Sequence, residues 1–86
     1  MKKVVDLRYD CNGVYAMKED GTVACFPWVH DDEEIPSDGR FIEVSERHGV
    51  RAFEVQDNAL DWSNQWERKS LWGSDDKEDI INQING

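Results

Sequence analysis

Residues 3–29, KVVDLRYDCNGVYAMKEDGTVACFPWV, decide the fold, because three short apolar runs alternate there with two turn signals. In the first run, Val5, Leu7 and Tyr9 share one face of a strand. An Asn-Gly and an Asp-Gly dipeptide separate the runs, and glycine there tolerates the positive φ of a tight hairpin turn. The stretch therefore predicts an antiparallel meander of three strands.

Pro27 lies inside the third run and has no N–H for a strand ladder. We therefore expect that strand at the edge of the sheet, or bulged at the proline. Further along, RFIEVS (residues 40–45) and VRAFEVQ (residues 50–56) also alternate. They predict a hairpin, which brings the sheet to as many as five strands.

The pattern changes after Asp57. Trp62 and Trp66 stand four residues apart, which places them on one helical face, although DWSN also suits an irregular loop before one short turn. At the end of the chain, an N-cap serine, an acidic first turn and the stripe Ile80, Ile81, Ile84 predict a helix over about residues 75–85.

This order of elements predicts an α+β fold, a small antiparallel sheet of four to five strands with one or two C-terminal helices packed on one face. A chain of 86 residues has room for one domain and one modest core. We divide that domain, residues 1–86, into an N-terminal meander (about 3–29), an acidic loop (30–39), a hairpin (about 40–56) and a Trp-rich segment with the C-terminal helix (57–86).

The charge of the chain is strongly negative and unevenly placed. Ten basic residues against nineteen acidic ones give a formal net charge of −9. Residues 31–46 alone carry seven acids and one base, Arg40. Such a field repels nucleic-acid phosphates and anionic membranes, so direct binding to either is disfavoured.

Two features of the sequence indicate a cytoplasmic protein. Asp6 and Arg8 interrupt the only apolar run near the N-terminus, which is too short for a signal peptide, and no later run has the length of a membrane span. With no secretory signal, we expect Cys11 and Cys25 to be reduced thiols rather than a disulfide.

Catalysis, metal binding and cofactor binding all lack a motif. Cys11, Cys25, His30 and His48 provide thiols and imidazoles, but no Gly-rich elbow or oxyanion donor follows either cysteine. The HDDEE run has neither the ligand alternation nor the turn glycine of an EF-hand. The scattered glycines form no phosphate-binding loop. We therefore expect a non-enzymatic protein with no metal and no cofactor.

Four stretches carry a family resemblance: VVDLRY (4–9), EDGTVACFPW (19–28), and GRFIEVSERHG (39–49) leading into NALDW (58–62). Together they span residues 4–62 and resemble a family of short uncharacterised bacterial and phage proteins, some of them encoded beside toxin–antitoxin-like partners. The resemblance implies a small β-rich fold and supplies no catalytic residues. The acidic run at residues 31–34 and the Trp-rich segment fall outside the family pattern.

An acidic loop beside aromatic side chains is typical of a surface that engages a basic groove, because charge steers the encounter and aromatic anchors hold it. The candidate acids are Asp31, Asp32, Glu33, Glu34, Asp38, Glu43 and Glu46, and the candidate anchors are Trp28, Trp62 and Trp66. The competing interpretation is that the tryptophans are core and the loop is simply solvated.

These features lead to two hypotheses about function. In the first, the chain docks on a basic, nucleic-acid-binding protein such as a nuclease and inhibits or regulates it, as phage anti-defence, anti-CRISPR-like or DNA-mimic proteins do. In the alternative, it is an accessory or antitoxin-like subunit of a bacterial operon that binds its partner through an apolar Trp and Ile surface. The sequence leaves the oligomeric state open.

Overall fold

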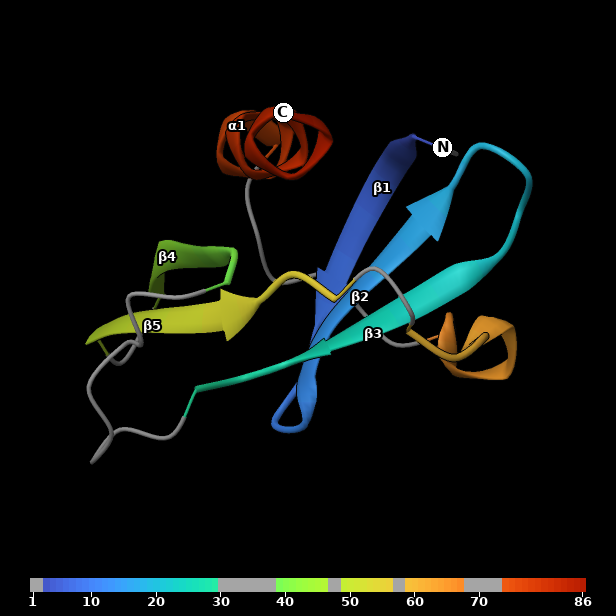
Figure 1. Ribbon diagram of the computed structural model, residues 1–86, viewed down its shortest axis with the longest axis horizontal. Coiled ribbons are helices and arrows are strands. Elements are labelled where there is room, and N and C mark those ends of the chain that lie inside the picture. The colour runs from blue at the N-terminus through green and yellow to red at the C-terminus, as the bar shows by residue number, and fades with distance from the viewer. Residues whose placement is uncertain (1–2, 30–38, 47–48, 57–58, 68–73) are drawn as a thin grey trace.

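Five strands and one α-helix make up the computed structural model, which describes residues 3–29, 39–46, 49–56, 59–67 and 74–86 (Figure 1). The strands are β1 (Val4–Tyr9), β2 (Gly13–Lys18), β3 (Val23–Pro27), β4 (Phe41–Glu46) and β5 (Gly49–Glu54). The helix α1 spans Ser74–Asn85, and one 3-10 turn, η1, spans Ser63–Gln65. The predicted α+β class is confirmed, and so are the meander, the hairpin and the C-terminal helix.

The five strands form two antiparallel sheets, β1-β2-β3 and β4-β5. The two residues that follow β3 pair with β5. Trp28 forms an antiparallel backbone bridge with Phe53, and the Val29 N–H donates to the Ala52 carbonyl over 2.9 Å. The spatial order is therefore β1-β2-β3-β5-β4.

Helix α1 packs against β1 and β4, the two outermost strands of that order (Figure 1). Ile80 and Ile84 reach the core from α1, and Ile81 packs against it. The apolar stripe predicted from the sequence is thus the face that α1 buries. One cluster joins both sheets and the helix: Val4, Leu7, Tyr9, Val14, Ala16, Ala24, Phe26, Ile42, Val44, Phe53, Ile80 and Ile84.

A bulge in β1 changes which valine enters the core. The β1–β2 register shifts between Val4 and Asp6, so Val4 is buried with Leu7 while Val5 is 54% exposed. The prediction that Val5 shares the face of Leu7 and Tyr9 is therefore wrong. Simple alternation misses this, because an extra residue in one strand reverses the facing of everything before it.

The glycines of the two meander turns act differently. Gly21 has a φ of 87°, as predicted for a tight turn. Gly13 does not have a positive φ, and here the prediction is wrong. Its lack of a side chain matters instead because a Cβ would lie 2.5 Å from the Phe26 carbonyl oxygen of the neighbouring strand.

Strand β3 lies at the edge of the first sheet, as Pro27 predicted. The bond from the Lys18 N–H to the Thr22 carbonyl, 2.8 Å, sets the alternation of the β2–β3 ladder. By that alternation the backbone polar groups of Val23 and Pro27 point away from β2. The missing N–H of Pro27 therefore costs the ladder nothing.

Candidate protein-binding surface

Most of the acidic loop lies outside the described residues. Asp31, Asp32, Glu33, Glu34 and Asp38 fall there, as does the side chain of Glu46. Glu43, the remaining predicted acid, is exposed on β4 between the buried Ile42 and Val44.

The chain is fixed on both sides of that loop. Before it, the Val29 N–H donates to the Ala52 carbonyl over 2.9 Å, and after it the Arg40 carbonyl accepts from the Val55 N–H over 2.7 Å. Ala52 lies in β5 and Val55 directly follows it. The residues on either side of the loop, Val29 and Arg40, are therefore both bonded to the same short stretch, residues 52–55.

Trp28, which precedes the loop, is only partly exposed and is held on several sides. Its indole N–H donates to the Asp10 carbonyl over 2.7 Å. Its ring meets Tyr9 and Phe53 edge to face, with centroids 5.8 and 6.1 Å apart, and packs against the core. This geometry makes Trp28 a rigid join between the two sheets, with part of its surface left toward solvent.

Trp62 belongs to a second, smaller apolar contact on the other face of the meander. Tyr15 lies between Val14 and Ala16 on β2, so its side chain points away from the main core, and it is nevertheless only 1% exposed. The Trp62 ring packs on it with centroids 6.2 Å apart at 66°. The segment around Trp62 thus covers the face that the helix and hairpin leave open.

The same segment is pinned along β3. Asp61 forms a bridge with Ala24, and the Trp62 N–H donates to the Val23 carbonyl over 2.6 Å. The Asp61 carboxylate accepts hydrogen bonds from the Ser63 hydroxyl and from the Ser63 N–H, the latter at 2.9 Å. These bonds lower the pKa of Asp61 below its ordinary value, the hydroxyl bond most strongly.

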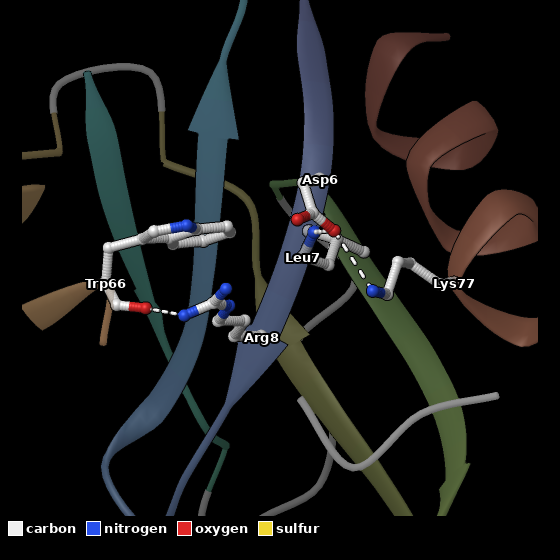
Figure 2. A network of polar contacts seen from close by, with 5 residues as sticks. All are labelled: Asp6, Leu7, Arg8, Trp66 and Lys77. Carbon is white, nitrogen blue, oxygen red and sulfur yellow. Dashed lines mark hydrogen bonds and ion pairs between the residues drawn. The ribbon is translucent and has the colours of Figure 1, made fainter. Parts of the chain in front are cut away.

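Trp66 is held by Arg8 of β1 (Figure 2). The guanidinium carbon of Arg8 lies 4.2 Å from the centre of the Trp66 ring, and Arg8 Nη1 also donates to the Trp66 carbonyl. Residues 59–67 therefore cross the sheet from β3, over Tyr15, to β1. The structure brings Trp62 and Trp66 to this one face but places Trp28 elsewhere, at the join of the sheets.

Between Trp62 and Trp66 the chain forms one 3-10 turn, Ser63–Gln65, and not the α-helix that their spacing favoured. The irregular aromatic loop, the other reading of DWSN, is what the structure has. Contacts of Trp62 with β2 and of Trp66 with β1 direct the backbone there more strongly than the i, i+4 pattern does.

Basic side chains are largely engaged inside the fold. Besides Arg8, Arg40 Nη2 donates to the Gln83 and Ile84 carbonyls of α1 over 3.1 and 2.6 Å, at the negative end of the helix dipole. The Arg51 guanidinium lies 5.7 Å from the centre of the Trp28 ring. Lys77 Nζ lies 3.1 Å from Asp6 Oδ1, and Figure 2 shows this ion pair between α1 and β1.

Acidic side chains, in contrast, are mostly exposed. The exposed acids within the described ranges are Glu19, Asp20, Glu43, Asp61, Glu67, Asp76, Glu78 and Asp79. In the same ranges the exposed bases are Lys3 and Arg40, and Arg40 is bound to the end of α1. The negative charge of the sequence is therefore concentrated at the surface.

The two cysteines are not joined by a disulfide. Cys11 is exposed. For Cys25, partial burial raises the pKa of the thiol most, and the nearby Asp10 carboxylate raises it further, while a hydrogen bond with Tyr15 lowers it in part. A raised pKa leaves little thiolate at neutral pH. Within the described ranges, no group of three His, Cys, Asp or Glu side chains could hold a metal ion. No helix in those ranges is long and apolar enough to cross a membrane.

Comparison with known proteins gave no match among family models, curated proteins or solved structures.

The contacts that sequence reasoning missed are those of Arg8 with Trp66 and of Arg40 with the end of α1. Only a weak indication of the Arg8 contact is present in the sequence. Arg8 alternates with apolar residues on a strand, so its side chain lies on the face opposite the core.

Proposed function

We propose that this protein is a non-enzymatic acidic module that docks on the basic surface of a nucleic-acid-binding protein and inhibits or regulates it. Its negative surface occupies the site where phosphates would otherwise bind. Charge steers the encounter, and shape and aromatic contacts then hold the complex.

The observation that carries this proposal is the segregation of charge. Arg8, Arg40, Arg51 and Lys77 each contact a ring, a helix end or a carboxylate within the fold. The exposed acids have no comparable set of exposed bases around them within the described ranges. A surface of this kind repels phosphates and attracts the groove that binds them.

The acidic loop is the part of the chain where that charge is densest. It holds four consecutive acids, residues 31–34, and both of its flanks are hydrogen-bonded at β5. Trp28 stands at its start with its ring already fixed. A partner therefore pays little ordering entropy at the base of the loop, which favours recognition there.

The alternative, an accessory subunit held through an apolar Trp and Ile surface, is less well supported. Ile80 and Ile84 are 5% and 7% exposed and pack into the chain's own core. Large exposed hydrophobics in the described ranges are Val5, Val50 and Leu60, which come from three separate parts of the chain. The family resemblance of residues 4–62 stays a prediction.

The test is a pull-down from bacterial lysate at low and moderate salt with three forms of the chain. The first is native, and the second carries D31N, D32N, E33Q and E34Q. The third is a matched control, E19Q, E67Q, D76N and E78Q, which removes the same amount of charge from exposed positions elsewhere. Salt weakens surface electrostatics, so we expect less capture at the higher salt.

Capture of a basic nucleic-acid-binding protein, identified by mass spectrometry, by the native chain and by the matched control but not by the loop variant is the expected result. Equal, salt-resistant capture of one protein by all three forms would overturn the proposal.

A further inference from the structure

We infer that the outer edge of β4 is a strand-addition site for an extended, basic segment of a partner protein. This inference rests on the proposed function and specifies how part of the partner would bind. It starts from the hydrogen-bond alternation of the β4-β5 hairpin.

The bond from the Val55 N–H to the Arg40 carbonyl, 2.7 Å, fixes that alternation. The pairing register continues as Phe41 with Glu54, Ile42 with Phe53 and so on to the end of the strand. Every second residue from Arg40 therefore bonds to β5, and the N–H and C=O groups of Phe41, Glu43 and Ser45 point to the outer edge.

Each of the other open edges carries at least one hydrogen bond from this chain's own groups. On β1, the Asn85 amide binds the N–H and C=O of Val4. On the same strand, the Asp6 carboxylate accepts from the Leu7 N–H over 2.8 Å (Figure 2). On β3, Trp62 and Asp61 bind the backbone of Val23.

The outer edge of β5 bonds to the chain after β3, through Val29 and Ala52. For β4, none of the described residues supplies a hydrogen-bond partner to the outward N–H and C=O groups of Phe41, Glu43 or Ser45. Proteins generally cover or block such edges, so a β4 edge that carries no such bond from the described residues, beside edges that are partly covered, indicates a binding role.

Charge decides which strand fits. Glu43 and Ser45 are exposed on the outer face of β4, whereas Ile42 and Val44 point to the core. If two copies paired symmetrically through this edge, the register in which Phe41, Glu43 and Ser45 all form hydrogen bonds would place the two Glu43 side chains opposite each other. Like charges at opposed positions are unfavourable. A strand that places Lys or Arg opposite Glu43 gains instead, and the net charge of −9 favours the same partner.

The test uses amide hydrogen exchange by NMR and a nine-residue peptide in which lysine alternates with threonine or valine. We expect the amides of residues 41, 43 and 45 to exchange quickly in the free chain. The peptide should slow them by about tenfold or more. A peptide N-methylated on its pairing edge removes the same bonds without altering the protein, and it should give no protection.

S45P removes one outward N–H, and S45A is its matched control, which keeps it. Because the Ser45 N–H makes no bond to β5, S45P should keep the unfolding midpoint near that of S45A while weakening peptide binding about tenfold. Equal binding by S45P and S45A would overturn the inference.

Three further results would overturn it: slow exchange at residues 41, 43 and 45 in the free chain, protection that appears with protein concentration alone, and salt-sensitive peptide binding without new protection. The last of these leaves the proposed function standing. Protection as expected, together with no capture of a basic protein from lysate, would retain the edge site and remove the proposed function.

Discussion

The side-chain amide of Asn85 binds both backbone polar groups of Val4, accepting from its N–H and donating to its C=O over 3.0 Å each. It acts as a one-residue substitute for a neighbouring strand at the edge of β1. It also joins the last turn of α1 to the first strand, 81 residues away in sequence.

Replacing Asn85 with alanine removes both of these bonds and leaves the Val4 edge to water. Two ordinary hydrogen bonds correspond to a loss of about 1–2 kcal/mol in the free energy of unfolding. Urea denaturation measures it. N82A, on the exposed side of the same helix, should change stability by less than about 0.5 kcal/mol. Equal losses in the two variants would contradict the role assigned to Asn85.

A methyl group at position 13 meets a neighbouring strand. In G13A the new Cβ lies 2.5 Å from the Phe26 carbonyl oxygen, so the backbone of β2 or β3 must shift. We expect a loss of about 1–3 kcal/mol, measured by thermal or urea unfolding. The exposed neighbour provides the control, since N12A adds no atom near β3. An unchanged midpoint in G13A would show that the strands tolerate a wider spacing.

Much of the fold could be predicted from local pattern. Alternation gave the five strands, Pro27 gave the edge, and the isoleucine spacing gave α1 and its buried face. The bulge before Asp6 could not be predicted, because a register shift depends on how β1 pairs with β2 and leaves no mark in composition.

The cation–π contact between Arg8 and Trp66 joins β1 to residues 59–67. R8A should lower the free energy of unfolding by about 1–2 kcal/mol and shift the Trp66 indole N–H resonance. R8K keeps the charge but loses the planar donor fork, so it should recover only part of the loss. K3A, at an exposed lysine, serves as the control. A loss in K3A as large as in R8A would indicate a net-charge effect instead.

Asp61 should give the segment an acid-sensitive contact. Its pKa lies below the ordinary 3.8 because Ser63 donates to the carboxylate. A lowered folded-state pKa contributes stability that is fully present above the unfolded value and is lost as pH falls through the folded value. The titration of the Asp61 carboxyl resonance measures this, and S63A should raise its pKa toward 3.8. No change in S63A would remove Ser63 as the cause.

The candidate surface was harder to predict than the fold. Trp62 and Trp66 do lie on one face, but a 3-10 turn and not an α-helix joins them, and their contacts with β2 and β1 depend on residues distant in sequence. The contacts of Arg8 and Arg40 could not be predicted either. An arginine on a strand is expected to point into solvent unless its ring or carbonyl partner is known.

The central claim, that the acidic surface occupies a site meant for nucleic acid, is tested most directly by competition. The native chain is immobilised, the captured basic protein is bound to it at low salt, and duplex DNA is added in excess. We predict that DNA releases the protein in proportion to its concentration, because both compete for one basic surface. Retention of the protein at every DNA concentration would contradict the claim.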